Sequence, residues 1–406
     1  MNAPVISRPA LIVGGGIGGL AAALGLAQKG IRSIVLEKAP KLGEIGAGIQ
    51  LGPNAFHAFD YLGVGEAARG MAVYIDHLRL MDALSAEEIT NIDLGDAFRR
   101  RFRNPYAVVH RGDLHGVFLR ACEAHDLIEF RVASEVVGYD QDGASVTARL
   151  AGGERLTGSF LIGADGLWSN IRKQLAHDGP PRVSGHTTYR SVIPTEQMPE
   201  DLRWNAATLW AGPKCHIVHY PLSGWKVFNL VVTYHNDAPE PVAGKPVTEA
   251  EVMRGFEHIH PRAQSIIRHG RDWKLWVLCD RDPMPRWVDG RVALLGDAAH
   301  PMMQYFAQGA CMALEDAVCL SHLLERHSDD LAAGFAAYQR ERFARTARVQ
   351  LFSRAIGEHI YHPAGAHAAF RNAVMQAKSR EDFYADLAWL YGGTGLGAAA
   401  ETAAIS

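Results

Sequence analysis

The sequence lacks the cysteine patterns that cross-link secreted domains or hold structural zinc. Its five cysteines form an odd set without a C-x-x-C pair: Cys122, Cys215, Cys279, Cys311 and Cys319. Isolated cysteines of this kind are typical of a reducing compartment rather than of a disulfide framework. The N-terminus also lacks the basic region and cleavage site of a signal peptide. We therefore expect a cytoplasmic protein without disulfides and without a cysteine-based zinc site.

An excess of charge of one sign is also missing. The chain carries 41 basic and 44 acidic residues, and its basic run at 99–101 is short. This balance excludes an extended surface for nucleic acid. The longest apolar run, residues 11–27, is broken by glycines and is shorter than the ~20 residues that a membrane span needs. With 48% hydrophobic and 21% charged residues, the 406-residue chain is long enough for a soluble protein of two or three domains.

A predicted βαβ unit opens the chain. An apolar strand over residues 10–13 precedes a glycine-rich turn, an alanine-rich helix and a second strand over residues 33–36. The turn has G-x-G-x-x-G spacing, with glycines at Gly14, Gly16 and Gly19. Such glycines let a pyrophosphate approach the N-terminus of the helix, and Glu37 stands where a ribose-binding acid is expected. The unit predicts a site for FAD or NAD.

A second predicted strand–loop–helix lies at residues 294–317, and we expect the rest of the chain to be organised around it. Gly296 lets the backbone turn close to a ligand after a buried strand, and Asp297 places a carboxylate there that suits a ribose hydroxyl. Gly309 and Ala310 then open a helix whose free N–H groups would stabilise negative charge. Cys311, also at this helix start, is expected to be structural.

Two residues between these segments are further candidates. Asp165 follows a third apolar strand, so it is either the N-cap of the next helix or, as a second acid at the end of a strand, part of the cofactor crevice. Arg111 precedes a helical pattern and is available for a phosphate or flavin contact, although an arginine there also suits a surface salt bridge. The glycine-rich stretch 43–55 predicts a loop or short strand over the cofactor.

The three motifs occur in one order along the chain: the G-x-G-x-x-G turn with Glu37, then residues 163–166 (GADG), then residues 296–301 (GDAAHP). Together they resemble the single-component, FAD-dependent aromatic hydroxylases of the p-hydroxybenzoate hydroxylase type. The resemblance implies that Glu37 and Asp297 hold the riboses of FAD, that Arg111 contacts the flavin side and that Asp165 lies near the pyrophosphate. It also implies that NADH or NADPH, with NADH favoured, binds only transiently.

The resemblance implies an α/β fold in which a mostly antiparallel sheet is inserted into a Rossmann-like domain. Alternating apolar residues from about 185 to 276, joined by a strand near 77–80, predict that sheet. The expected division gives the FAD-binding domain residues 1–73, 101–180 and 277–356, the substrate domain residues 74–100 and 181–276, and a C-terminal helical segment with its tail residues 357–406. Within these limits we expect a helix near 247–258, a long helix over 331–356 with an arginine-rich exposed face, and a loosely ordered tail from 392.

Within the family, residues 212–216 (GPKCH) and 301–305 (PMMQY) are similar to members that hydroxylate 3-hydroxybenzoate para to its phenol, giving gentisate. The resemblance implies reaction of NAD(P)H and O2 through a flavin C4a-hydroperoxide. His216 is then the candidate base for the phenol, Gln304 a hydrogen-bonding partner of the same oxygen, and Tyr220 an orienting residue. Each of the three also suits a packing role.

Several alternatives remain open. Decarboxylative hydroxylation of salicylate or 6-hydroxynicotinate is the nearest, and a flavoprotein reductase or redox sensor that inserts no oxygen belongs to another class, as does a plain NAD dehydrogenase. The expected partners are a small aromatic acid and O2, with a possible homodimer. Histidines such as His219 and His300 lack the carboxylates and spacing of a metal site, so no metal is expected. The residue that holds the substrate carboxylate is not identified.

Overall fold

The computed structural model describes residues 6–43 and 47–393. Its parallel sheet has the strand order β19-β20-β12-β1-β2-β8, with β19 antiparallel to β20. The strands are β1 (Ala10–Val13), β2 (Ser33–Leu36), β8 (Ile128–Arg131), β12 (Leu161–Gly163), β19 (Val288–Asp289) and β20 (Val292–Leu294). Short, wholly apolar strands such as β1 suit a sheet covered on both faces. The order reverses at β1, between β2 and β12, which opens a crevice at the carboxyl ends of these strands.

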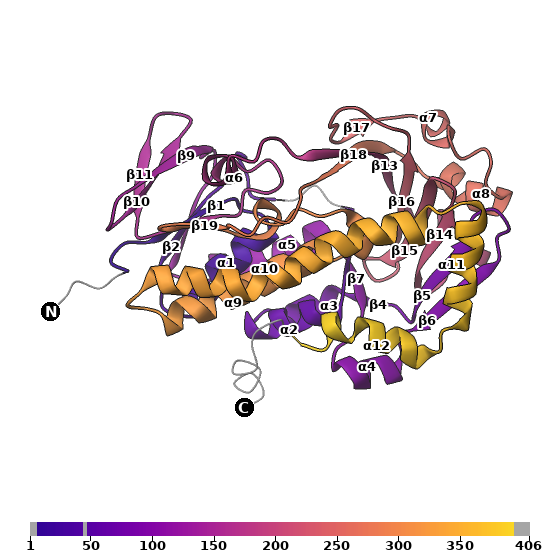
Figure 1. The fold of residues 1–406 in the computed structure, drawn as a ribbon, viewed down its shortest axis with the longest axis horizontal. Coiled ribbons are helices and arrows are strands. Elements are labelled where there is room, and N and C mark those ends of the chain that lie inside the picture. Colours follow the sequence, from indigo (N-terminus) through magenta and orange to yellow (C-terminus); the bar gives the residue numbers. More distant parts are fainter. Residues whose placement is uncertain (1–5, 44–46, 394–406) are drawn as a thin grey trace.

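Four long helices support this sheet and connect it to the rest of the molecule. They are α1 (Ile17–Ala27), α5 (Arg111–Glu123), α9 (Gly309–Arg326) and α10 (Leu331–Ile356). Helix α1 packs against both α5 and α9, and α9 packs against α10. Figure 1 shows α10 running the length of the molecule, from the parallel sheet to the larger sheet. The bounds of α10 confirm the prediction of a long helix over 331–356.

An eight-stranded, mostly antiparallel sheet forms the other half of the molecule, with the order β17-β18-β13-β16-β15-β14-β5-β6 (Figure 1). Its strands are β5 (His77–Asp82), β6 (Glu88–Asp93), β13 (Arg182–Pro194), β14 (Ala206–Gly212), β15 (Cys215–Leu222), β16 (Val227–His235), β17 (Lys245–Pro246) and β18 (Lys274–Asp280). One face packs on helices α7 (Glu249–Met253) and α8 (Pro261–His269), burying side chains such as Ile217 and Ile266 in a shared core. The other face is left for the cavity.

Smaller elements complete the fold. Two three-stranded sheets contain β3 (Gly48–Leu51), β4 (Val73–Tyr74) and β7 (Ala107–His110), and β9 (Val136–Gln141), β10 (Val146–Leu150) and β11 (Arg155–Gly158). The remaining helices are α2 (Pro53–Tyr61), α3 (Gly65–Met71), α4 (Asp96–Phe102), α6 (Asn170–Ala176), α11 (Gly365–Ala377) and α12 (Arg380–Tyr391). Short helical turns are η1 (Thr195–Gln197), η2 (Glu200–Leu202), η3 (Gly296–Ala298), η4 (Gln304–Phe306) and the π-helical η5 (Gly357–Tyr361). Tyr384 of α12 packs edge-on against Phe98 of α4, which ties the C-terminal segment to the core.

Strand register arranges one face of the larger sheet into rows. Because side chains alternate between faces, residues two apart along a strand share a face, and paired residues on neighbouring strands lie side by side. One row contains His216, Thr233 and Thr188; the next contains Val218, Val231 and Arg190. A further row pairs His186 with His235. His219, at an odd offset from His216, points to the opposite face.

Some predicted elements are corrected by the structure. The stretch 43–55, expected to be a loop or short strand, contains the short strand β3, but it becomes helical at Pro53, because proline at the first position of a helix has no N–H to lose; residues 44–46 lie outside the described residues. The helix expected near 247–258 ends at Met253, since Gly255 adopts φ +93° with the ring of Tyr234 packed against it. The sequence reading missed α8, which starts at Pro261.

The fold class is confirmed: a Rossmann-like α/β domain, an inserted and mostly antiparallel sheet, and a helical C-terminal segment. The division into domains stays a prediction, but its boundary at residue 276 is misplaced, because β18 continues to Asp280 within the larger sheet. Of the expected loose tail, residues 394–406 lie outside the described residues. No helix in the described part of the chain is long and apolar enough to span a membrane.

Candidate active site

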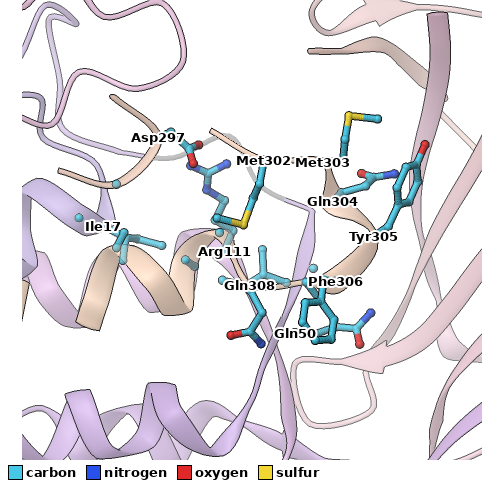
Figure 2. A pocket seen from close by; sticks show the side chains of 18 of the residues that line it. Ile17, Gln50, Arg111, Asp297, Met302, Met303, Gln304, Tyr305, Phe306 and Gln308 are labelled. Atoms are coloured by element: carbon cyan, nitrogen blue, oxygen red, sulfur yellow. The ribbon is translucent and has the colours of Figure 1, made fainter. Parts of the chain in front are cut away.

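A cavity of about 850 Å³ lies between the two large sheets. Its wall includes residues at the carboxyl ends of four parallel strands: Gly14 and Gly16 after β1, Glu37 after β2, Asp165 after β12, and Gly296 and Asp297 after β20. The opposite wall comes from the larger sheet and from the loop that carries Gln304. Figure 2 shows Ile17, Asp297 and Arg111 on one side of this cavity and Gln304 and Tyr305 on the other. A volume of this size suits a cofactor together with a small substrate.

The glycine turn after β1 is packed so closely that side chains are excluded. Gly14 adopts φ +109°, and a Cβ there would lie 2.4 Å from the carbonyl oxygen of Ala164. A Cβ on Gly19 would lie 2.0 Å from the carbonyl oxygen of Gly14, so Gly19 serves helix–strand contact and is not itself in the cavity wall. The N-terminus of α1 therefore reaches the cavity with its backbone N–H groups pointing outward, as a pyrophosphate requires.

Glu37 supports the glycine turn from the neighbouring strand. Its carboxylate accepts hydrogen bonds from the backbone N–H groups of Gly15 and Ala39, both at 2.8 Å. Each carboxylate oxygen has a second lone pair, so the side chain can still accept from a ribose hydroxyl. The sequence placed Glu37 at the cofactor, and the structure places it in the cavity wall, next to the turn expected to hold the pyrophosphate.

The turn that carries Asp297 is held from behind by a buried network of charged and polar side chains. Gly296 adopts φ +61°, and its N–H donates to the Asp316 carboxylate at 3.0 Å. We define the ion-pair network as His300, Glu315, Asp316, Arg342 and Arg345, together with the amide of Asn54. Asp297 itself is exposed to the cavity. The arrangement fixes the backbone while leaving the carboxylate of Asp297 available to a ligand.

Charge is fully paired inside the ion-pair network. The Arg342 guanidinium donates to Glu315 and Asp316, each at 2.7 Å, and all three side chains are completely buried. Burial opposes ionisation, but His300 and Arg342 outweigh it and lower the pKa of Asp316 to about 2. The expected arginine-rich exposed face of α10 includes the exposed Arg340 and Arg348, but Arg342 points into the core.

The N-terminus of α9 also reaches the cavity. Gly309 and Ala310 line it, and among the described residues no side chain caps the helix start, so its first N–H groups can meet a ligand. Burial raises the pKa of the Cys311 thiol to about 12, which disfavours the reactive thiolate and agrees with the expected structural role. Arg111, the first residue of α5, contributes its side chain to the same part of the wall (Figure 2).

Asp165 lies in the cavity wall, but its carboxylate is engaged by the start of α6. One oxygen accepts from the Ser169 hydroxyl at 2.5 Å and the other from the N–H of Ile171 at 3.2 Å. Ser169, not Asp165, is the N-cap of α6, since its hydroxyl accepts from the N–H of Arg172. Burial raises the pKa of Asp165 despite these donors. Its contact with cofactor stays a prediction.

On the opposite wall, His216 is buried and faces the cavity from β15. Its Nδ1 lies 2.7 Å from Nε2 of His362, which follows η5. Nε2 of His216 has no hydrogen-bond partner among the described residues. Burial, with His362 and His186 nearby, lowers the pKa of His216 well below its ordinary value. The expected base is therefore neutral in the structure, with one ring nitrogen paired and the other available to a ligand.

Tyr220 and Gln304 meet the cavity differently. Tyr220 is almost fully buried, and its ring packs so closely on Gly48 that a Cβ there would lie 2.6 Å from it. The side-chain amide of Gln304 is turned toward the sheet: it donates to the hydroxyls of Thr188 and Thr233, each at 3.2 Å. Its oxygen accepts from Arg190 at 2.8 Å, which leaves one lone pair for a ligand.

Sequence reasoning missed Arg190. This arginine lines the cavity from β13, and no carboxylate partner for it exists among the described residues. Burial lowers its pKa, and its Nε is buried without a partner. An unpaired guanidinium facing a cavity suits an anionic ligand. The sequence around an arginine in an alternating strand does not indicate that its side chain faces a cavity. Only the three-dimensional arrangement shows this position of Arg190.

The cavity residues fit FAD: two acids at the ends of different strands for the ribose and the ribityl hydroxyls, a glycine turn at a helix N-terminus for the pyrophosphate, and a second helix N-terminus for the flavin. No group of three or more metal-ligating side chains occurs within residues 6–43 and 47–393. Residues 7–353 match the FAD binding domain family, and the chain belongs to this family. It is thus a flavoprotein, and the expected family is confirmed.

Individual relatives cover almost the whole chain. The protein is 58% identical over 382 residues to 3-hydroxybenzoate 6-hydroxylase 1 of Aquipseudomonas alcaligenes, covering 94% of this chain and 97% of that one. It is 48% identical to 3-hydroxybenzoate 6-hydroxylase of Polaromonas naphthalenivorans, covering 95% and 96%. Among solved structures, Klebsiella pneumoniae HpxO in complex with FAD and uric acid superposes with a TM-score of 0.83 at 26% identity, covering 95% and 96%.

Proposed function

We propose that this flavoprotein hydroxylates 3-hydroxybenzoate para to its phenol and gives gentisate, with NADH and O2 as co-substrates. The high identity to relatives named for this activity supports the substrate. The single structural observation that carries the chemistry is His216, a neutral imidazole that presents an unpartnered Nε2 to the cavity while Nδ1 is held by His362.

The reaction requires a phenol that becomes more electron-rich as an oxygen atom is transferred. Bound FAD, once reduced by NADH, supplies that oxygen atom from O2. His216 Nε2 accepts the phenol proton, which raises the nucleophilicity of the ring carbon para to the oxygen. Gln304 lines the cavity beside Arg190, from which its oxygen accepts a hydrogen bond, and Tyr220 orients the ring. Glu37 and Asp297 would hold the ribose and the ribityl chain of FAD.

Arg190 is our candidate for the substrate carboxylate. It shares a row of the sheet with Val218 and Val231, next to the row of His216, so a benzoate whose phenol meets His216 can reach it across the sheet face. A carboxylate would offset the buried positive charge that has no partner among the described residues. The apolar Val218 and Val231 would lie under the ring between the two polar ends.

The alternative substrates are supported less well. A relative named 6-hydroxynicotinate 3-monooxygenase, from Bordetella bronchiseptica, is 33% identical over 348 residues. A decarboxylating hydroxylase attacks the carbon that bears the carboxylate, whereas the proposed reaction leaves the carboxylate in place on Arg190. A sensor that inserts no oxygen has no use for a base in the cavity. The predicted homodimer and cytoplasmic location remain proposals for size-exclusion chromatography and cell fractionation.

The test is a substrate panel with the FAD-loaded protein, NADH and air. 3-Hydroxybenzoate, salicylate and 6-hydroxynicotinate are incubated separately, and products and NADH consumption are quantified by chromatography. We expect gentisate from 3-hydroxybenzoate in near-equal amount to the NADH consumed, and little product from the others. NADH oxidised to peroxide without product, or faster product formation from salicylate, contradicts the proposal. Repeating the panel with NADPH tests the assignment of the reductant.

A further inference from the structure

Four histidines gather on the cavity face of the larger sheet and extend from the cavity toward the surface. We define the histidine cluster as His186, His216, His235 and His362. His216 lies in the cavity wall, and His186 and His235 form the cross-strand pair one row further out. His362 bridges them from above the sheet: its ring centroid lies 5.0 Å from that of His216 and 5.2 Å from that of His186.

Solvent is reached at the outer end of the histidine cluster. The rings of His186 and His235 are 4.1 Å apart, and the His235 side chain keeps 34% of its surface exposed. Nε2 of His235 lies 3.3 Å from the carboxylate of Asp237, which is 80% exposed. At the inner end His216 is only 1% exposed. The cluster therefore extends from a buried nitrogen to a carboxylate at the protein surface, with a polar contact at each end and ring contacts between them.

We propose that His362 carries the phenol proton from His216 out of the cavity to the His186–His235 pair and Asp237. This inference rests on the proposed function of His216 as the base. His362 does not touch the substrate and acts through His216, so it is a positioning and relay residue. Neither the family-wide motifs nor the predicted site included it.

The geometry of the central pair defines the tautomers that this relay needs. If Nδ1 of His216 carries the proton, it donates to Nε2 of His362, and Nε2 of His216 is left as the acceptor for the phenol. The phenol O–H then breaks as an N–H forms on Nε2 of His216. The proton on Nδ1 of His216 passes to Nε2 of His362, and the proton on Nδ1 of His362 leaves toward the outer pair. Each ring ends neutral, and one proton has moved outward.

Burial disfavours the protonated form of the rings in the histidine cluster. Burial lowers the pKa of His362 to about 3 and that of His186 to about 4. The titratable or charged groups that face the two central rings and the outer pair come from the sheet, the 302–306 loop and η5: His186, His235, Arg182, Asp280, Tyr305 and Tyr361. Tyr305 bonds its hydroxyl to Nδ1 of His186, so that ring is held in place. The protonated form of either ring is therefore short-lived.

The experiment follows proton release when substrate binds. FAD-loaded enzyme is mixed rapidly with 3-hydroxybenzoate in weakly buffered solution containing a pH indicator, and binding is followed separately by flavin absorbance. We expect release at least about ten-fold slower in His362→Ala, with substrate affinity changed by less than about two-fold. Added imidazole should restore the rate by filling the space left by the ring. His359→Ala, an exposed histidine in the same segment, is the matched control and should release protons as the wild type does.

Release by His362→Ala at the wild-type rate overturns the relay. Slow release that imidazole leaves unchanged also overturns it, because it marks a structural role. A His235→Asn variant separates the two ends of the path: it should slow release without altering the binding signal, and an unchanged rate shows that the outer pair is not the exit. Failure of the wild type to form gentisate would contradict the proposed function instead, so the two failures are distinguishable.

Discussion

The ion-pair network and the histidine cluster lie on opposite sides of one cavity, and they differ in how their charges are paired. In the network Arg342 is surrounded by carboxylates, and its pairing keeps Asp316 ionised with a pKa near 2. In the cluster no carboxylate within residues 6–43 and 47–393 contacts the inner rings, and burial lowers the pKa of His216 and His362. Paired charges hold the turn of Asp297 in one shape, whereas unpaired imidazoles can accept and pass a proton. We propose that the first region fixes the cofactor and that the second serves the substrate.

The largest effect on hydroxylation is expected from a change in the histidine cluster. His216→Ala should retain FAD but lose about 10²–10⁴-fold in hydroxylation rate, because the phenol loses its base. His219→Gln on the same strand is the matched control, since His219 points to the opposite face, where Trp210 donates to it at 3.2 Å. Rates of gentisate formation measure both. Near-normal turnover in His216→Ala would refute the assignment of the base.

In the ion-pair network, Arg342→Met should lower the free energy of unfolding by about 3–5 kcal/mol, because Glu315 and Asp316 lose their buried counter-charge. Arg340→Met, an exposed arginine of the same helix, should change it by less than about 0.5 kcal/mol. Urea titrations of the two variants give the comparison. Equal stabilities would mean that the network does not hold the fold as described.

A smaller effect is expected where the network meets the cofactor. Asp297→Ala should weaken FAD binding by about 10- to 100-fold, equivalent to the about 1.5–3 kcal/mol of a hydrogen bond to a charged group. Asp329→Ala, an exposed carboxylate before α10, should leave binding unchanged. Flavin fluorescence on serial dilution measures the loss. An Asp297→Ala protein that stays yellow on dilution contradicts the ribose role.

The pH dependence of stability should separate the buried histidines of the larger sheet, on both of its faces, from the ion-pair network by the pH range in which each contribution is lost. The folded-state pKa values of His186, His219 and His362 lie near 4, 3 and 3, below the ordinary 6.5, so the unfolded chain binds protons first. Their contribution is complete above pH 6.5 and is lost as pH falls below it, by at most about 1.4 kcal/mol per pH unit for each ring. The contribution of Asp316 is lost only below its ordinary 3.8, toward about 2.

Urea titrations between pH 7.5 and 4.5 therefore report the histidines, and titrations below pH 4 report the network. His219→Gln should reduce the pH dependence of the free energy of unfolding between pH 7.5 and 4.5 and leave that below pH 4 unchanged. Arg342→Met should act on the pH dependence below pH 4, because Asp316 without Arg342 titrates closer to its ordinary value. Parallel pH profiles for His219→Gln and the wild type would contradict a buried neutral ring in the folded state.

Local patterns were enough to predict much of the fold and one wall of the cavity. Glycine spacing, apolar strands and strand-end acids identified Gly14, Glu37 and Asp297, because these features depend on residues close together in the chain. The predicted placement of Gly19 at the cofactor was imprecise, since its neighbour is the backbone of Gly14. Alternation along β15 also placed His216 on a sheet facing the cofactor.

Long-range contacts explain what could not be predicted. His362 meets His216 across 146 positions of sequence, and no spacing rule connects them. Arg342 follows a helical pattern that looks exposed, and only its pairing with α9 accounts for its burial. The side chain of Gln304 turns toward Thr188 and Thr233 because three chain segments meet there. Such contacts depend on packing of the whole chain, which a single sequence read locally does not encode.

The most direct measurement is the reaction of 3-hydroxybenzoate with NADH under isotope-labelled O2, with the product separated by chromatography and weighed by mass spectrometry. In the proposed complex, FAD lies at the wall supported by the ion-pair network and the phenol of the substrate lies at His216. This arrangement predicts gentisate that carries one labelled oxygen atom at the position para to the original hydroxyl. Unlabelled gentisate, a dihydroxybenzoate of another substitution pattern, or peroxide without aromatic product would contradict it.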